Sequence, residues 1–216
     1  MNTNLENMNF SKELDKTIEN IMASDKTPSL LMHSCCAPCS SYCLEYLSDF
    51  FDITVLYYNP NIFPKEEYEY RISEQERLIN NLPVKNKIKF ISTEYTPNDF
   101  HNKIKGFEKE PEGGKRCEEC FKIRLEYTAN LAKEMGFDYF VTTLSISPLK
   151  NSKLLNKIGL EIEKKYGVKY LLSDFKKKNG YKRSVELSKI YELYRQDYCG
   201  CIYSKLEREN EKSKLQ

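Results

Sequence analysis

Cysteine is the residue type in this sequence that could carry chemistry, because most of its eight copies lie in three close groups. The groups are Cys35/Cys36, Cys117/Cys120 and Cys199/Cys201. Many cysteines can also indicate a secreted disulfide scaffold, but such proteins are short and loop-rich and carry a signal peptide. Residues 1–16 are polar and mixed in charge, with no apolar segment of that kind. The clustered thiols therefore indicate metal ligation or redox chemistry in a reducing compartment.

The spacing of Cys117 and Cys120 allows both sulfurs to bind one metal centre. Adjacent cysteines such as Cys35 and Cys36 do not easily wrap a single ion, but they can bind different corners of a cluster. Four thiolates from these two segments match the four cysteines that hold a [4Fe-4S] cluster. Cys39 competes with Cys35, because Cys36 and Cys39 with the second pair would form a four-cysteine zinc site. The spacing leaves both options open.

The Cys199-Gly200-Cys201 segment suggests a different use of sulfur. A disulfide across one intervening residue closes a small, strained ring, for which Gly200 supplies backbone freedom. Strained disulfides are labile and often catalytic, so this pair could carry two electrons by cycling between dithiol and disulfide. The alternatives are two more metal ligands or two inert thiols. Cys43, on a predicted helix, is expected to be a small buried hydrophobe.

Alternating strands and helices are predicted to position these cysteines. Short apolar or β-branched runs predict strands at 29–33, 53–58, 87–92, 138–144 and 168–172. Helical spacing of apolar residues predicts helices between them, with Pro38 in the first turn of one, and further helices over 1–25 and beyond the last strand. This α/β alternation predicts a parallel sheet with helices on both faces.

The carboxyl ends of the strands form the edge where such sheets bind their ligands. Cys35 and Cys36 follow the first predicted strand directly, and residues 145–148 follow the fourth. We therefore expect the functional site at this edge of the sheet.

Composition restricts the class of protein without naming a partner. A length of 216 residues suits a single domain, and 34 basic against 32 acidic residues give a net charge of only +2. No run approaches the roughly 18 apolar residues that a membrane span needs. We expect a cytoplasmic protein that does not bind a membrane.

Several motifs together resemble the QueH type of epoxyqueuosine reductase. They are His33–Pro38, Tyr58–Ile62, Arg116–Cys120 with Arg124-Leu125, Thr142–Pro148, Ser173–Lys178, Gly180-Tyr181 and Tyr194–Cys201. The resemblance covers residues 29–204, which leaves the predicted helix over 1–25 ahead of the family core and a polar tail over 205–216 behind it.

The resemblance implies a Rossmann-like fold related to nucleotide hydrolases, with a helical C-terminal region. It implies an enzyme that reduces the epoxide of epoxyqueuosine in the tRNA anticodon to give queuosine, with electrons from a donor that the sequence does not identify. By the same resemblance, one [4Fe-4S] cluster is held by Cys35, Cys36, Cys117 and Cys120, and Cys199 with Cys201 form a redox-active disulfide. A second metal ion, iron or zinc, beside the cluster is also compatible with the family.

The remaining machinery is predicted only as sets of candidates. The proton donor is sought among His33, Asp174, Asp197 and Tyr198, each of which could instead be structural. Contacts to tRNA phosphates are expected from a basic loop over 176–183 and from Lys150, Lys153 and Lys157. The residues that could stack on a nucleobase are Tyr57, Tyr58, Tyr181 and Tyr198.

Three other functions fit the sequence less well. An adenylyl-sulfate reductase or a cluster-dependent tRNA thiolase needs a phosphate-binding loop after the first strand, but residues 33–38 contain no glycine. A zinc-stabilised RNA-binding module would leave the Cys199 and Cys201 pair unexplained.

Overall fold

A parallel β-sheet organises the chain in the computed structural model, which describes residues 5–24 and 26–214. Its strands are β1 (Ser29–His33), β2 (Asp52–Tyr57), β3 (Lys89–Ser92), β4 (Tyr139–Thr142) and β5 (Lys169–Tyr170). They lie in the order β3-β2-β1-β4-β5, and every neighbouring pair is parallel. The α/β class, the parallel sheet and its Rossmann-like form are therefore confirmed.

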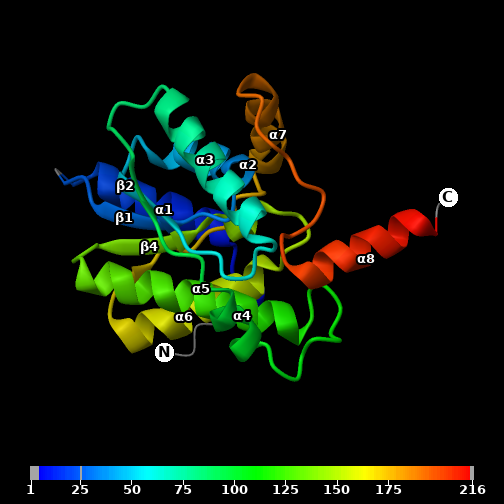
Figure 1. The fold of residues 1–216 in the computed structure, drawn as a ribbon. Coiled ribbons are helices and arrows are strands. Elements are labelled where there is room, and N and C mark those ends of the chain that lie inside the picture. Colours follow the sequence, from blue (N-terminus) through cyan, green and yellow to red (C-terminus); the bar gives the residue numbers. More distant parts are fainter. Residues whose placement is uncertain (1–4, 25, 215–216) are drawn as a thin grey trace.

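Helices cover both faces of this sheet (Figure 1). They are α1 (Phe10–Met22), α2 (Ala37–Leu47), α3 (Lys65–Asn81), α4 (Pro97–Lys103), α5 (Lys115–Glu134), α6 (Ser152–Tyr166), α7 (Gly180–Ile190) and α8 (Ile202–Ser213), with 3₁₀ turns η1 (Leu5–Asn7) and η2 (Thr143–Ile146). Figure 1 shows α2, α3 and α7 above the sheet and α5 and α6 below it, while α8 projects outward. Within the described residues, no helix is both long enough and apolar enough to cross a bilayer.

The central strand β1 shows why two layers of helices are needed. Leu30 and Met32 pack into the core formed with α1, α2 and α3, whereas Leu31, with the opposite side-chain direction, packs with α5 and α6. All three side chains are completely buried. A strand that is apolar on both faces can only be stable between two helical layers.

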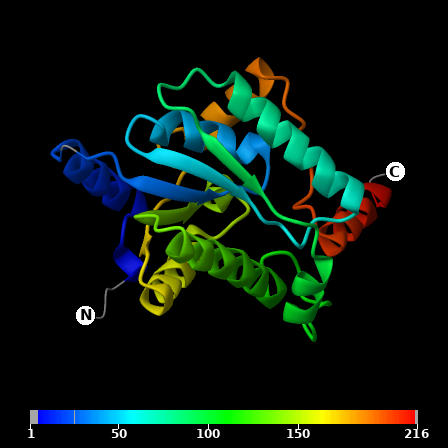
Figure 2. The same cartoon turned by 60° about the vertical axis from the view of Figure 1, so that its left-hand side comes forward.

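The strand order creates a topological switch point beside β1. From β1 the chain moves outward through β2 to β3, and then returns to the other side of β1 to form β4 and β5. The loops after β1 and β4 therefore diverge at one place, which is where open parallel sheets bind their ligands. Figure 2 shows the parallel strands from a second direction.

Several predicted boundaries differ from the structure. The predicted helix over 1–25 is α1, and it begins only after Asn9, whose side chain accepts a hydrogen bond from the Lys12 amide. Residues 1–4 and 25 of that prediction lie outside the described residues. Helix α4 was not predicted, although Thr96-Pro97 is a recognisable helix start because proline suits the first turn. The predicted polar tail over 205–216 is helical as far as Ser213.

Candidate metal–thiol site

The turn between β1 and α2 presents the adjacent cysteines at the switch point. Cys36 is the N-cap of α2, and Pro38 occupies the first turn of this helix, where a missing amide proton costs nothing. Ser34 fixes the turn, because its amide donates to the Leu56 carbonyl and its hydroxyl donates to Gln75 Oε1 at 2.6 Å. The backbone thereby holds two neighbouring thiols at the carboxyl edge of the sheet.

Cys35, Cys36 and Cys39 form a compact thiol group. The three sulfurs lie within 4.8 Å of one another, and the Cys35 and Cys36 sulfurs are 3.8 Å apart. Cys39 joins this group because it lies one helical turn beyond the N-cap. In the part of the chain that the structure describes, no other three metal-ligating side chains lie this close together.

Cys36 is the most acidic thiol of the three. Hydrogen bonds from Cys35 and then Cys39 lower its pKa, and the positive charge of Arg71 lowers it further. The position at the N-terminus of α2 acts in the same direction, because a helix N-terminus favours negative charge. Hydrogen bonds with Cys35 and then with Cys36 raise the pKa of Cys39. Within the group, Cys36 is therefore the thiol that loses its proton most readily, with Cys35 and Cys39 beside it.

Cys117 and Cys120 lie in the first turns of α5, below the sheet. The Gly113 amide donates to the Cys117 sulfur at 3.2 Å, and burial raises the pKa of Cys120 to about 11. These two thiols are not part of the compact group of three. Both thiols nevertheless interact electrostatically with Arg124, and Cys35 does so as well. One buried cation therefore interacts with thiols from both segments.

Cys199, Gly200 and Cys201 lie in an extended segment that joins α7 to α8. Cys199 is half-buried, whereas Cys201 is buried and packs with Cys120, and both are free thiols. The Ser204 amide donates to the Cys201 sulfur at 3.4 Å, and the Gly200 carbonyl accepts from the Phe63 amide. The C-terminal cysteines therefore reach the edge of the sheet where the other thiols lie.

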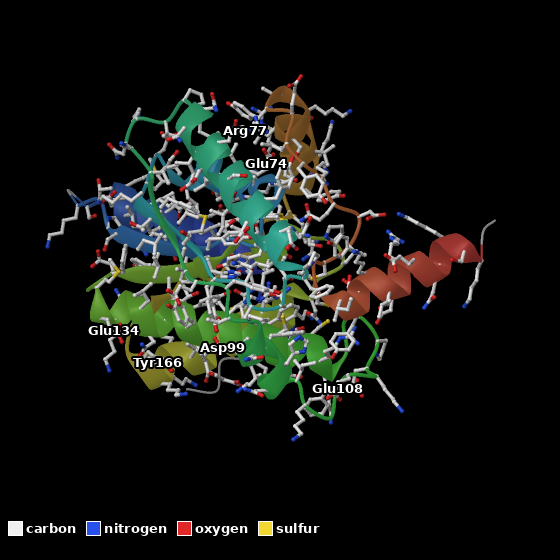
Figure 3. All side chains as sticks on the ribbon, viewed as in Figure 1. Glu74, Arg77, Asp99, Glu108, Glu134 and Tyr166 are labelled. Atoms are coloured by element: carbon white, nitrogen blue, oxygen red, sulfur yellow. The ribbon has the colours of Figure 1, made fainter. Side chains whose placement is uncertain are left out.

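Helix α3 holds the chain that leads to this segment. Arg77 donates to the carbonyl of Tyr191 at 2.9 Å, and the Glu74 carboxylate accepts from the Tyr194 amide at 3.0 Å. Figure 3 labels Glu74 and Arg77 on α3, next to α7. Closer to the thiols, the Arg71 guanidinium lies over the Tyr198 ring at 5.6 Å from its centre.

A cavity of about 530 Å³ lies at the junction of these segments. Its wall includes Cys35, Cys36 and Cys39 from the first group and Cys199 from the C-terminal segment. Cys117, Cys120 and Cys201 lie outside its wall. The cavity therefore gives a ligand access to four of the eight cysteines.

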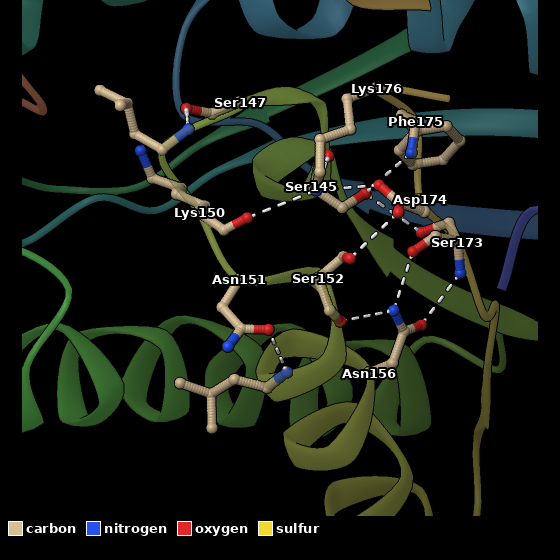
Figure 4. Close-up of polar contacts among 12 residues, drawn as sticks. Ser145, Ser147, Lys150, Asn151, Ser152, Asn156, Ser173, Asp174, Phe175 and Lys176 are labelled. Atoms are coloured by element: carbon tan, nitrogen blue, oxygen red, sulfur yellow. Dashed lines mark hydrogen bonds and ion pairs between the residues drawn. The ribbon is translucent and has the colours of Figure 1, made fainter. Parts of the chain in front are cut away.

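Lys150 contributes a cation to this cavity. Burial opposes its charge, but the thiols of Cys199 and Cys35 outweigh that effect and raise the pKa of Lys150. Lys150 lies in the segment after β4, which the segment after β5 holds: Lys176 donates to the Lys150 carbonyl, and the Phe175 amide donates to the Ser145 hydroxyl (Figure 4). From the sequence, Lys150 was expected only to contact tRNA phosphates, because no local pattern indicates that it lies at the same cavity as the thiols.

The structure separates the four candidates for a proton donor. His33 is buried, its Nε2–H donates to the Tyr58 carbonyl, and burial followed by the charge of Arg124 lowers its pKa to about 4. Asp174 pairs with Lys176 at 2.9 Å and accepts from a serine, as Figure 4 shows. Asp197 lines the cavity, but an ion pair with Lys212 lowers its pKa.

Tyr198 is the candidate that lines the cavity and has a phenol whose pKa is raised. Burial, and then the charge of Glu67, raise the pKa of its phenol. A phenol that stays protonated can donate a proton or a hydrogen bond to a ligand in the cavity.

The predicted stacking and basic residues divide in a similar way. Tyr57 and Tyr58 are buried in the core, whereas Tyr181 and Tyr198 line the cavity. The predicted basic loop over 176–183 is a loop only as far as Asn179, because α7 begins at Gly180. Carboxylates neutralise most of its basic residues; the ion pairs are Lys176–Asp174, Lys178–Asp15, Arg183–Glu45 and Arg183–Glu186. Most basic side chains of this segment are therefore paired with carboxylates and are not free to bind phosphate.

The donor set fits a metal–sulfur group. Thiolates are the ligands of iron–sulfur clusters and also suit zinc. A bound anionic centre would also explain Arg124, which is 1% exposed and has an Nη2 atom without a hydrogen-bond partner. A buried cation of this kind normally requires a negative partner.

Fold and site together define an α/β protein built around a thiol centre that is suited to metal binding and redox chemistry. The family model for Epoxyqueuosine reductase QueH matches residues 30–207, and the chain belongs to this family. An epoxyqueuosine reductase QueH of Streptococcus pyogenes is 47% identical over 206 residues, which cover 94% of this chain and 80% of the relative. The relative from Thermotoga maritima is 38% identical and is covered to 95% of its length.

Proposed function

We propose that this protein reduces the epoxide of epoxyqueuosine in tRNA to the alkene of queuosine. The family membership supports the reaction, since the relatives carry the name epoxyqueuosine reductase. The observation that carries the mechanism is the cavity, in which Cys199 and the compact group of Cys35, Cys36 and Cys39 share one wall.

Cys199 and Cys201 are proposed to supply the two electrons. Their oxidation to a disulfide releases two electrons and two protons, and removal of the epoxide oxygen as water consumes both. The two C–O bonds break, the C=C bond and the S–S bond form, and an external reductant must then restore the dithiol. Gly200 supports this role, since its positive φ of 116° gives the backbone between the two cysteines a conformation that other residues rarely adopt.

Cys35, Cys36, Cys117 and Cys120 are proposed as the ligands of one [4Fe-4S] cluster, which would supply electron transfer and an electrophile when bound. Thiols that come from two segments, and do not form one compact group of four, suit a cluster better than a single zinc ion. Cys39 is left as a thiol beside these ligands, where it could help to hold a second ion, iron or zinc.

Lys150 and Tyr198 are proposed to act on the epoxide oxygen. The Lys150 ammonium in the cavity wall stabilises the negative charge that develops as a C–O bond breaks, and a neutral phenol can protonate that oxygen. Tyr181, which is 39% exposed at the cavity, can stack on the extruded base.

Turnover in vitro tests the proposal. Protein purified without oxygen is analysed for iron and acid-labile sulfide and then incubated with epoxyqueuosine tRNA and a chemical reductant. Nucleoside mass spectrometry should detect queuosine. Protein that contains iron and sulfide but forms no queuosine would contradict the proposed reaction, and protein with one zinc and no sulfide would contradict the cluster.

Two cysteine variants separate the electron carrier from the rest of the site. Cys199→Ser should retain iron and sulfide but lose turnover. Cys43→Ser is the matched control, because Cys43 is buried on α2 outside the cavity wall. This variant should keep the iron and sulfide and also keep turnover. Full activity of Cys199→Ser would exclude the dithiol as the electron source.

A further inference from the structure

Three arginines are among the largest fully buried side chains: Arg71, Arg116 and Arg124. Burial of a charged group is costly unless a partner compensates the charge. Arg71 pairs with the Glu67 carboxylate at 2.7 Å, and Arg116 pairs with Glu207 at 2.9 Å. Arg124 pairs with no carboxylate among the described residues, so its charge lacks the compensation that the other two have.

The hydrogen bonds of Arg124 leave part of its guanidinium unused. Nε donates to the carbonyl of Cys120 at 3.0 Å, one turn earlier on α5. Nη2 is buried and has no acceptor. The Phe121 ring lies 5.7 Å from the guanidinium carbon, but it offers no acceptor for this N–H group.

Thiols are the groups that act most strongly on this guanidinium. Burial opposes its charge, whereas Cys120, Cys199 and Cys35 favour it, in that order, and their combined effect raises the pKa of Arg124. These cysteines come from three separate segments of the chain. Arg124 is thus a permanent cation whose charge interacts with thiols from all three segments.

We propose that Arg124 is the internal counter-ion of the metal–sulfur centre, to which its Nη2 donates a hydrogen bond, and that it sets the reduction potential of that centre. This inference depends on the proposed function, because it requires that the centre is bound. Four thiolates give such a centre a net negative charge, and a nearby positive charge or hydrogen bond makes it easier to reduce. Arg124 is therefore a positioning and tuning residue, with no contact to substrate.

Two substitutions separate charge from geometry. Arg124→Gln removes the positive charge, whereas Arg124→Lys keeps it but loses the planar fork of N–H groups. The control is Arg183→Gln, because Arg183 pairs with Glu45 and Glu186 on the surface and no thiol acts on it.

The midpoint potential, followed by visible absorption and electron paramagnetic resonance in anaerobic redox titrations, is the readout. We expect Arg124→Gln to shift the potential to a more negative value, Arg124→Lys to shift it less, and Arg183→Gln to leave it unchanged. Arg124→Gln with a full content of iron and sulfide and the potential of the unmodified protein would overturn the inference.

Metal analysis distinguishes failure of the proposed function from failure of the proposed role of Arg124. Unmodified protein without iron and sulfide would contradict the proposed function itself. If Arg124→Gln does not retain the centre, the midpoint potential of Arg124→Lys is the deciding measurement. A potential shifted from that of the unmodified protein supports the role of the guanidinium, and an unchanged potential overturns that role.

Discussion

At the scale of single residues, Cys199 and Cys201 differ in access. Cys199 lines the cavity, whereas Cys201 is buried at the N-terminus of α8. Burial, and then the charge of Cys199, raise the pKa of Cys201 to about 12. Cys199 is therefore the thiol that can meet a ligand, and Cys201 is the thiol that completes a disulfide behind it.

This asymmetry predicts the order of alkylation. Brief treatment of the reduced protein with iodoacetamide at neutral pH should modify Cys199 before Cys201, because the thiolate is the reactive form and must be accessible. Peptide mass spectrometry over a time course measures both sites. Equal rates at the two cysteines would show that the segment opens in solution.

Gly200 is expected to tolerate no side chain. Its φ is +116°, and a Cβ atom there would lie 3.0 Å from Arg71 Nη1 and 3.1 Å from Ile62 Cγ1. Gly200→Ala should therefore lower the free energy of unfolding by about 1–3 kcal/mol, measured by denaturant titration, and also reduce turnover.

Gly136→Ala is the control for the glycine prediction. Gly136 also has a positive φ, of +73°, but a Cβ atom there meets nothing within 4 Å. Gly136→Ala should lower the free energy of unfolding less than Gly200→Ala does, and it should leave turnover unchanged. Similar losses at both positions would mean that backbone strain alone, and not contact with Arg71, restricts Gly200.

At the scale of elements, a carboxylate joins the starts of β1 and β4. Asp138 accepts hydrogen bonds from the Ser29 amide and hydroxyl, both at 2.8 Å. The hydrogen bond from the Ser29 amide, and then the hydrogen bond from its hydroxyl, lower the pKa of the Asp138 carboxyl. This contact fixes the relative position of the strands whose opposite ends carry Cys35 and Thr143.

Asp138→Asn should make the protein less stable in a pH-dependent way. Since the folded state lowers the pKa, ionised Asp138 stabilises the fold above the ordinary carboxyl pKa of about 4, and this contribution is lost as the pH falls. The difference in free energy of unfolding between the two proteins should be nearly constant from pH 7 to about pH 5, and should shrink as the pH falls below about 4, through the lowered pKa of Asp138 in the folded state.

Urea unfolding across that pH range measures the effect of Asp138. Asp49→Asn provides a comparison, because Asp49 forms only a long, exposed ion pair with Lys85 at 4.0 Å. A difference for Asp138→Asn that stays constant with pH would exclude the ionised carboxylate as the stabilising form.

At the scale of the whole molecule, charge pairing decides which basic residues can reach a nucleic acid. Asp15 on α1 and Glu45 on α2 engage Lys178 and Arg183, which lie far away in the sequence. Lys177 and Lys182 are exposed, and no carboxylate among the described residues pairs with them. They flank Tyr181, which lies at the cavity.

Lys177→Glu and Lys182→Glu should therefore weaken tRNA binding more than Lys178→Glu does. Each lost phosphate contact should reduce the slope of log affinity against log salt by about 1. Binding titrations at several salt concentrations measure this slope. Lys87→Glu, near the start of β3 at the opposite edge of the sheet, is the control, and an equal effect there would exclude a local tRNA surface.

The sequence alone determined the features that depend on neighbouring residues. The run Ser29–His33 and the turn into Pro38 fixed a buried strand followed by a helix, so Cys35 and Cys36 could be placed at the edge of the sheet. Gly136 was correctly predicted to end α5. Local propensity and periodicity suffice for such features, because they involve only residues close in the chain.

Only the tertiary structure decided which distant residues share a site. The packing of the helices on the sheet buries Arg124, on which thiols from separate segments act. It also places Lys150 in the cavity wall and Tyr58 in the core. The same packing joined Lys178 to Asp15 and so removed much of the predicted basic patch. Burial and charge pairing depend on how helices pack across the sheet, and no local pattern of residues encodes that arrangement.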